Sequence, residues 1–597
     1  MKCFPMCGIT GFVGAGAFKK ALEGLKTLEY RGYDSAGTAF LANGKMGIVK
    51  TVGDVASLLK KAEGADTSGS TTAIAHTRWA THGGVTDANA HPHADCTGKI
   101  AIIHNGIIEN YSDLREELKR EGHRFASQTD TEVISHQIEE EMKGGPFGKA
   151  ALAAARKFRG SYAILAICSD APGVMVAAKN ESPLVIASGP GFAAAASDPV
   201  PLLPYAKKGV FLEDGDFAVA EKGKIEVYGI ASGEKIGRGE IGFGSVEAVV
   251  DKKDFPHFML KEIYESPSAM KMACAQDAAA TGRAASEIRR RRTVFVACGT
   301  SRHAALVGRY LFNRVAGKIC DVVVASEFPY IAQNLVGNDL FIIAVSQSGE
   351  TADVLEGVKI AKAHGAKILS VTNAVGSSLD RIADYSLHLN CGPEVGVAAT
   401  KTFMAQLSIM FALSSALSNG KAENEKEKIA AIARECQEYF PSWEEKARAL
   451  SQRLKAEQAV YFIARGPSFP AALEGALKFK EITYIHAEGM AAGELKHGTL
   501  ALVSSGTPIV AVCPDDYTRN ATISNVMETK ARGAFVIGVS DRNDPSFDEF
   551  IEVPRVGENH YPLAFAIPLQ LLAYHTAVLK GNNPDRPRNL AKSVTVK

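Results

Sequence analysis

Over its first 230 residues the chain alternates between short apolar runs and amphipathic stretches. The amphipathic stretches at 112–121 and 130–141 repeat apolar residues at helical spacing, whereas the short runs are rich in residues that favour strands. The strand-like runs lie at 72–76, 100–104, 163–167 and 209–212. This pattern predicts a layered α/β or α+β domain over residues 7–230.

A charged, irregular segment follows, and we interpret residues 231–285 as a connector that leads into helices. Just beyond it lies a basic run at 289–292. Such a run is typical of a solvated face, so it does not by itself indicate nucleic-acid binding.

The second half of the chain contains an internal repeat. The run at 294–301 resembles the run at 461–468, and at the same offset 341–346 corresponds to 508–513. In each copy an apolar strand ends in a turn of small residues and is followed by a helix and another strand, which predicts a parallel sheet with helices on both faces. We expect two similar α/β subdomains related by a pseudo-twofold axis. They span 286–430 and 450–597.

Composition excludes several classes of partner. Among 597 residues, 67 are Lys or Arg and 66 are Asp or Glu, so we expect neither nucleic acid nor an anionic membrane as a main partner. The 10 cysteines form no CxxC pair and no Cys/His zinc spacing. We therefore expect no disulfide framework, no metal and a reducing, cytoplasmic setting.

Two stretches without charged residues, 402–420 and 561–579, are long enough to raise the question of a membrane span. Both contain several polar residues or prolines. We expect buried helices of a large globular protein rather than membrane spans.

Small hydroxyl residues follow two strands of the first repeat, in the segments 298–301 and 346–351. Hydroxyls and free backbone N–H groups at the start of a helix can bind phosphate, and open parallel sheets bind ligands at this edge. Helix capping alone is the alternative interpretation. The second copy has Asp515 and Asp516 at the corresponding loop, where carboxylates would repel phosphate. We therefore expect a phosphate site in the first copy only.

A charged trio in the second copy has helical spacing. Glu474, Lys478 and Glu481 lie at i, i+4 and i+7, and therefore on one helix face. Surface salt bridges would give the same pattern, but the apolar residues that follow also favour an acid/base site. A polar, glycine-flanked loop at 493–498 follows and contains His497.

Longer motifs identify a resemblance that spans Cys7 to the C-terminus. They lie at 7–12, 28–37, 75–83, 104–110, 128–132 and 587–593, and occur together with the two repeats. In content and order they resemble the glutamine–fructose-6-phosphate aminotransferase family. The resemblance implies an N-terminal nucleophile (Ntn) glutaminase domain of α/β/β/α layers, followed by two sugar isomerase (SIS) domains. It also implies an enzyme of hexosamine biosynthesis that passes ammonia from L-glutamine to fructose 6-phosphate and needs no cofactor.

In the glutaminase half, the resemblance makes Cys7 the nucleophile, with its own α-amine as the base. Asn105 and Gly106 would form the oxyanion hole through a side-chain amide and a backbone N–H. Arg78 and Asp130 would hold the substrate's α-carboxylate and α-amino groups. Thr81 and His82 would line the same loop, and Trp79 would form the gate to the ammonia channel.

In the sugar half, the resemblance makes Lys592 the residue that forms an imine with the open-chain ketose. Glu481 would move the proton between sugar carbons with Lys478 nearby, and His497 of a neighbouring subunit would assist ring opening, which implies at least a homodimer. The side chains that would hold the phosphate and the sugar hydroxyls are Thr300, Ser301, Ser346, Gln347, Ser348 and Thr351. Ala399 stands where the family commonly has serine, so one contact is expected to be missing.

Six residues precede Cys7, although an α-amine base requires Cys7 to be the first residue. We expect translation to start at Met6, with that methionine removed, or else a short propeptide to be cleaved.

Two other functions would account for part of these features. A different glutamine amidotransferase would share the first domain but lack the double sugar isomerase half. A sugar-phosphate-sensing binding protein would not need Glu481, Lys592 and the glutaminase residues together.

Overall fold

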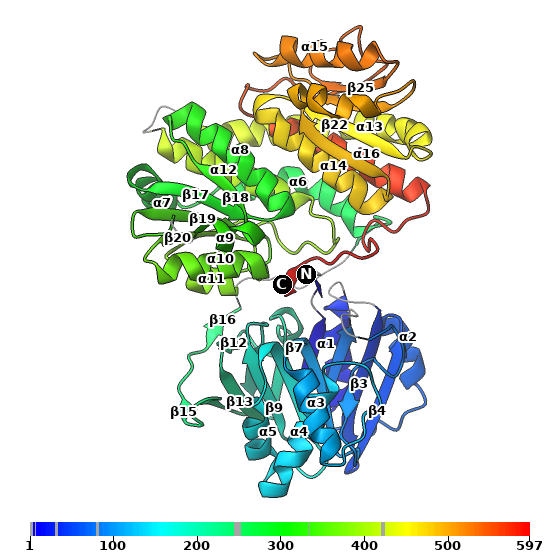
Figure 1. The fold of residues 1–597 in the computed structure, drawn as a ribbon, viewed down its shortest axis with the longest axis vertical. Coiled ribbons are helices and arrows are strands. Elements are labelled where there is room, and N and C mark those ends of the chain that lie inside the picture. The colour runs from blue at the N-terminus through cyan, green and yellow to red at the C-terminus, as the bar shows by residue number, and fades with distance from the viewer. Residues whose placement is uncertain are drawn as a thin grey trace. The chain divides into compact units, whose positions relative to one another are not determined.

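The computed structural model describes residues 4–5, 7–29, 34–78, 83–243, 252–332, 335–418 and 424–596. The chain forms two compact units (Figure 1). The first comprises Met1–Val250 with Ser593–Lys597, and the second comprises Asp251–Lys592. Each unit is described by itself.

Two antiparallel sheets form the centre of the first unit. The eight-stranded sheet, in spatial order, contains β16 (Ile241–Gly242), β12 (Lys208–Phe211), β10 (Val185–Gly189), β11 (Phe192–Ala196), β2 (Gly8–Val13), β5 (Thr72–Arg78), β3 (Ser35–Ala42) and β4 (Lys45–Val52). The seven-stranded sheet contains β15 (Lys235–Ile236), β14 (Lys224–Gly229), β13 (Asp216–Glu221), β9 (Met175–Asn180), β8 (Gly160–Cys168), β7 (Ile100–Ile108) and β6 (His93–Ala94). Separately, β1 (Phe4–Pro5) pairs antiparallel with β27 (Val594–Val596).

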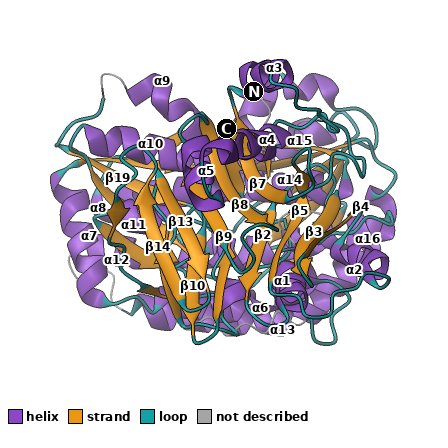
Figure 2. Ribbon diagram, turned by 90° about the horizontal axis from the view of Figure 1, so that it is seen from below, coloured by secondary structure: helices purple, strands orange, loops and turns teal. Residues whose placement is uncertain are grey.

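Helices cover the outer faces of both sheets (Figure 2). The helices are α1 (Ala17–Lys26) and α2 (Val55–Ala62) on the eight-stranded sheet, and α3 (Tyr111–Arg120), α4 (Glu132–Glu141) and α5 (Phe147–Ala155) on the seven-stranded sheet. Alternate strand residues point to opposite faces, so each sheet contributes one face to a central core, which includes Ile74 and Leu165, and the other to a helix-facing core. The result is the predicted α/β/β/α layering.

The second unit contains two five-stranded parallel sheets. The first, in spatial order, contains β18 (Asp321–Val324), β17 (Arg292–Ala297), β19 (Leu340–Val345), β20 (Lys367–Thr372) and β21 (Tyr385–His388). The second contains β23 (His486–Ala491), β22 (Ala459–Ala464), β24 (Pro508–Val512), β25 (Phe535–Ser540) and β26 (Glu549–Glu552). Corresponding strands occupy corresponding places in the two sheets, so the prediction of two similar parallel α/β subdomains is confirmed.

A helical core joins these two sheets within the unit. Its helices are α6 (Phe258–Cys274), α7 (Ala278–Arg290), α8 (Gly299–Ala316), α12 (Lys401–Leu417), α13 (Glu425–Leu454), α14 (Phe469–Thr483) and α16 (Tyr561–Leu579). The other helices contribute to separate cores on the other faces of the sheets: α9 (Phe328–Ala332), α10 (Ala352–Ala363) and α11 (Ser378–Ile382) with the first sheet, and α15 (Arg519–Lys530) with the second. The two uncharged stretches form α12 and α16, and both are buried as predicted. Among the described residues, α16 alone has the length and composition to cross a membrane, and 89% of its apolar window is buried in the protein.

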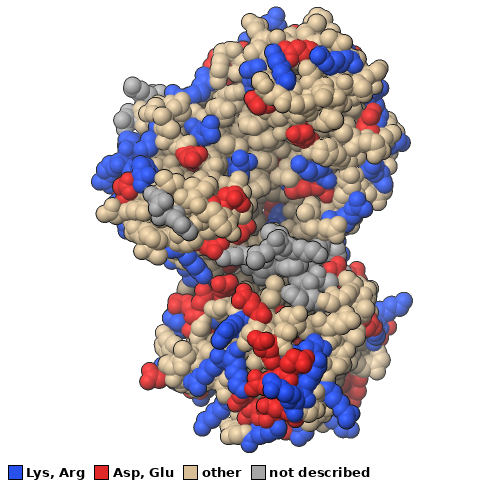
Figure 3. All heavy atoms as spheres, in the orientation of Figure 1, with Lys and Arg blue, Asp and Glu red and all other residues tan. Residues whose placement is uncertain are grey.

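The expected connector, 231–285, contains ordered structure. Its later part forms α6 and the start of α7, and α6 contributes Met259, Ile263 and Met270 to the core of the second unit. The exact domain boundaries remain predictions. In the basic run, Arg290 and Arg291 pair with Glu287, and basic and acidic side chains are interspersed on the face drawn in Figure 3.

Candidate functional sites

Cys7 lies immediately before β2, where strand pairing holds it. The β2–β5 register places Gly8 opposite Thr77, and the Gly8 N–H donates to Thr77 Oγ1 at 3.0 Å. The side-chain amide of Asn105 on β7 donates to the Cys7 carbonyl oxygen at 2.7 Å. The two sheets thus bring together residues 98 positions apart in sequence.

A buried histidine orients Asn105. His76 Nε2 lies 3.1 Å from Asn105 Oδ1 and 3.1 Å from the His104 carbonyl oxygen. Burial lowers the pKa of His76 to about 3, although the Asn105 contact opposes the shift. The ring is therefore neutral near pH 7, and Nε2–H can donate to Asn105 Oδ1. That contact directs the amide N–H₂ group toward Cys7.

Gly106 has a backbone that only glycine accommodates well. Its φ is +120°, and a Cβ at this position would lie 2.0 Å from the Ser161 carbonyl oxygen on the neighbouring strand β8. Glycine at this position therefore lets β7 pass β8 closely. The predicted oxyanion donors, Asn105 and Gly106, are adjacent on one rigid strand.

Arg78 and Asp130 lie in the same buried electrostatic environment as Cys7. Arg78 is 3% exposed, and its guanidinium donates to the Gly84 carbonyl oxygen at 3.3 Å. Burial lowers the pKa of Arg78, while Cys7 and Asp130 oppose that shift. Asp130 Oδ2 accepts from the Ile108 N–H at 2.9 Å. Arg78 therefore interacts electrostatically with both Cys7 and Asp130. Trp79, Thr81 and His82 fall outside the described residues.

In the second unit, the segment 346–351 forms a compact hydroxyl-lined turn between β19 and α10. Ser346 Oγ lies 2.8 Å from Thr351 Oγ1 and accepts from the Gly349 N–H at 3.1 Å. Ser348 Oγ accepts from the Glu350 N–H at 3.2 Å. These contacts orient hydroxyls and backbone N–H groups at the carboxyl edge of the sheet. Gln347 belongs to the same turn, and its carbonyl oxygen accepts from Thr372 Oγ1 at 3.3 Å.

The corresponding turn of the second copy has different chemistry. Asp516 accepts from the Thr518 N–H at 2.7 Å and therefore closes its own turn. Asp515 forms ion pairs with Arg542 at 3.3 Å and Arg555 at 3.4 Å. Asp515 corresponds to Ser348 and Asp516 to Gly349 of the first copy, and the two carboxylates support a phosphate site in the first copy only.

Glu474 joins the two repeats. Its carboxylate accepts from Thr300 Oγ1 at 2.9 Å and lies 2.7 Å from His303 Nδ1, both on α8. It also lies 3.4 Å from Lys478 Nζ, which is 2.5 Å from Glu481. Glu474 and Lys478 are each 1% exposed, so the surface salt-bridge alternative is wrong for this pair.

The trio is electrostatically suited to proton transfer. Burial raises the pKa of Glu481, and the Lys478 ammonium opposes the shift. Burial alone would lower the pKa of Lys478. Its pKa is nevertheless raised, because Glu481 and Glu474 stabilise the charged ammonium. A carboxyl whose affinity for protons is increased can act as an acid or a base. Nearby, Ser301 Oγ accepts from Gln406 Nε2 at 2.9 Å.

Lys592 is held in a second buried ionic cluster. It pairs with Glu394 and donates to the Gly396 carbonyl oxygen at 2.8 Å. Glu394 also accepts from the Thr402 hydroxyl at 2.7 Å. Burial and the Glu394 charge raise the pKa of the neighbouring Glu262 to about 8. Although burial opposes the shift, Lys592 keeps the pKa of Glu394 below its usual value, so the two groups form a buried pair of ammonium and carboxylate.

Not all predicted residues meet. His497 ends the short 3₁₀ helix η6 (Ala492–His497) and is exposed. Sequence reasoning assigned no role to His76, His303 or Glu394. His76 could have been found from the sequence because it lies within the motif at 75–83. Glu394 could not, because only folding brings it to Lys592.

Comparisons with known proteins agree with this arrangement. The description "SIS domain" matches residues 288–416 and 453–580, and "Glutamine amidotransferase domain" matches 76–204. Relatives called glutamine–fructose-6-phosphate aminotransferase [isomerizing] are 46% identical in Thermococcus kodakarensis and 44% in Pyrococcus horikoshii. Both alignments cover 99% of this chain and 100% of the relative.

A solved structure matches the second half. It is the C-terminal domain of glucosamine-fructose-6-phosphate aminotransferase from Francisella tularensis, with a TM-score of 0.52 and 34% identity. It covers 56% of this chain and 100% of that one. With identity above 40% to the two relatives along almost the whole chain, this chain belongs to the glutamine–fructose-6-phosphate aminotransferase (isomerizing) family.

Proposed function

We propose that this enzyme converts fructose 6-phosphate and L-glutamine to glucosamine 6-phosphate and L-glutamate. The structural observation that carries the proposal is the contact of Thr300 with Glu474. It connects the hydroxyl-rich sheet edge of the first repeat to the buried acid/base trio of the second. A phosphosugar held at that edge would therefore present its carbons to proton-transfer groups.

In the glutaminase half, the Cys7 thiolate attacks the side-chain carbonyl carbon of glutamine. The oxyanion receives hydrogen bonds from the Asn105 amide and the Gly106 N–H. Once the residues that precede it are removed, the Cys7 α-amine takes the thiol proton and returns a proton to the departing nitrogen, which leaves as ammonia. Water then cleaves the thioester and releases glutamate, while Arg78 and Asp130 hold the α-carboxylate and the α-amino group.

In the sugar half, Thr300, Ser301 and the turn at 346–351 hold the phosphate and the hydroxyls. Lys592 condenses with the C2 carbonyl and releases water, and ammonia then displaces the lysine amine from the imine. The Glu481 carboxylate removes a proton from C1, holds it as the neutral acid and returns it to C2, which gives the 2-amino aldose. Lys478 stabilises the Glu481 carboxylate before the first proton transfer and after the second.

The proposal also covers the ammonia gate, the oligomeric state, the domain boundaries and the location of the enzyme. Trp79 gates the passage of ammonia between the two sites. A homodimer supplies His497 to the sugar site of the neighbouring subunit, which is consistent with its exposure in this chain. The domains span 7–230, 286–430 and 450–597, and the enzyme acts in the cytoplasm.

The test is formation of glucosamine 6-phosphate from glutamine and fructose 6-phosphate by the purified chain. Lys592→Met should abolish formation of this product, because methionine cannot form the imine. Lys580→Met is the matched control, since Lys580 is exposed at the end of α16. A sugar-phosphate-sensing protein would form no product in either case, and product formation by Lys592→Met at the normal rate would refute the assigned role.

A further inference from the structure

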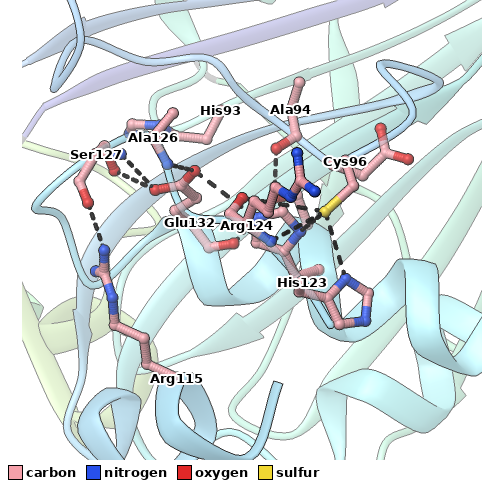
Figure 4. Close-up of polar contacts among 12 residues, drawn as sticks. His93, Ala94, Cys96, Arg115, His123, Arg124, Ala126, Ser127 and Glu132 are labelled. Atoms are coloured by element: carbon pink, nitrogen blue, oxygen red, sulfur yellow. Dashed lines mark hydrogen bonds and ion pairs between the residues drawn. The ribbon is translucent and has the colours of Figure 1, made fainter. Parts of the chain in front are cut away.

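Four side chains with metal-ligating atoms meet in the first unit, away from Cys7 in sequence. Cys96 follows β6, His123 lies between α3 and α4, and His136 and Glu139 lie one turn apart on α4. One ligand atom from each lies within 4.8 Å of all the others. Figure 4 shows the Cys96 sulfur directed toward the His123 ring.

The separations match a tetrahedral site. Cys96 Sγ lies 3.7 Å from His123 Nδ1 and 3.5 Å from His136 Nδ1. Glu139 Oε2 lies 3.0 Å from His123 Nδ1 and 3.2 Å from His136 Nδ1. Zinc bonds of about 2.3 Å to sulfur and about 2.0–2.1 Å to nitrogen and oxygen, at tetrahedral angles, put S and N about 3.5 Å apart and N and O about 3.3 Å apart.

The outer contacts are also those of a metal centre. His123 Nε2 lies 3.0 Å from Glu140 Oε2, and His136 Nε2 lies 3.6 Å from Glu132 Oε1. Metal-bound histidines usually donate from the other ring nitrogen to a carboxylate, as His123 does, whereas the His136 separation is too long for a hydrogen bond. The Arg124 backbone N–H donates to Cys96 Sγ at 3.3 Å, as suits a sulfur with negative charge.

The arrangement of charge favours a cation at the centre. Both ring nitrogens of His123 face a carboxylate oxygen at 3.0 Å. A cation bound at Nδ1 would lie between this ring and the Glu139 carboxylate and would leave Nε2–H to donate to Glu140. The His123 and His136 side chains are 6% and 1% exposed, so water has little access to them.

We propose that Cys96, His123, His136 and Glu139 bind one Zn²⁺ ion. Thiolate and imidazole ligands in tetrahedral array select zinc among the common divalent cations, and four protein ligands are typical of a structural site. The sequence pattern predicted no zinc because the ligands come from three separate segments without a CxxC pair. Only the folded chain brings these four side chains close together.

The ion would fasten the turn after β6 and the α3–α4 connection to α4. Glu132, at the start of α4, accepts from the Ala126 and Ser127 N–H groups at 2.7 Å each. The segment between Ser127 and Glu132 contains Asp130, so zinc would fix the loop that presents this carboxylate. This consequence for glutamine binding rests on the proposed function, whereas the metal site itself does not.

The experiment is elemental analysis of the full chain purified with a thiol reductant, followed by chelation and titration with Co²⁺. We expect one zinc per chain and, for the cobalt form, the intense visible bands of a tetrahedral ion with thiolate charge transfer. Cys96→Ser and His123→Asn should each lower metal affinity at least about tenfold. His364→Asn is the matched control, because His364 is exposed at the end of α10 in the other unit.

The outcomes separate clearly. Absence of zinc both as purified and after reconstitution would overturn the proposal, as would undiminished zinc binding by Cys96→Ser. Far-UV circular dichroism identifies a variant that fails to fold. If the variants do not fold, the cobalt spectrum of the unaltered chain decides whether a tetrahedral site with a thiolate ligand exists. A raised KM for glutamine in the metal-free form, reversed by zinc, would support the loop-fixing role. If zinc binds but its removal leaves the KM for glutamine unchanged, the loop-fixing role is wrong while the metal site stands.

Discussion

At the scale of single residues, Gly106 shows how backbone geometry limits the glutaminase site. Gly106→Ala would place a Cβ 2.0 Å from the Ser161 carbonyl oxygen at a φ of +120°, so β7 must shift and move the oxyanion donors. Loss of one such donor costs about 100-fold or more in kcat. We expect glutamine hydrolysis to fall by at least that factor. Gly98→Ala is the control, since Gly98 also has a positive φ, of +69°, but a Cβ there meets nothing within 4 Å.

Glu262 links one buried carboxyl to the pH dependence of stability. Burial and the Glu394 charge raise its pKa to about 8 in the folded chain, against about 4.3 when unfolded. Between these values the folded state retains a proton that the unfolded state has released, so stability falls as pH rises through the window.

Replacing that carboxyl should flatten the dependence. We expect Tm of the unaltered chain to fall from about pH 5 to about pH 8 and Tm of Glu262→Gln to fall less, measured by scanning calorimetry. Glu445→Gln, an exposed position on α13, should retain the original slope. Equal slopes in all three proteins would show that Glu262 titrates normally.

At the scale of elements, the two strand-to-helix turns of the repeat form a natural comparison. Ser348→Asp places a carboxylate in the hydroxyl-lined turn of the first copy, where like charges repel phosphate. We expect fructose 6-phosphate binding, measured by calorimetry, to weaken by about 100-fold or more, with glutamine hydrolysis unchanged. Tyr517→Asp makes the same change in an exposed position of the second copy's turn and should leave binding intact. Similar losses in both variants would contradict a phosphate site confined to the first copy.

The elements also show which features sequence can predict. Strand and helix positions follow from local apolar patterns, so β5, β7, α12 and α16 lie where the patterns indicate. The repeat predicted two parallel sheets because its copies share the same order of apolar strand, turn, helix and second strand. Contacts between distant segments were not predictable in this way. The Lys592–Glu394 pair joins residues 198 positions apart, and the Cys96 cluster draws on three segments, so only the folded chain reveals either.

At the scale of the whole molecule, the two reactions should be separable by single substitutions. Each unit has its own hydrophobic cores, and Cys7 and Lys592 belong to different units. Cys7→Ala removes the thiolate but no contact of the sugar site. We expect it to abolish glutamine hydrolysis and to leave the fructose 6-phosphate affinity within about twofold of the original value.

Lys592→Ala should give the reverse result. Without an amine no imine forms, so glucosamine 6-phosphate production stops, while the buried Glu394 loses its ion-pair partner. Glutamate release by the glutaminase unit should continue, because Asn105, Gly106 and Arg78 are unaffected. The measurement is glutamate and glucosamine 6-phosphate from the same reaction, with and without sugar. Loss of glutamate release in Lys592→Ala, or a large loss of fructose 6-phosphate affinity in Cys7→Ala, with the fold retained by circular dichroism, would show that the two active sites cannot act independently.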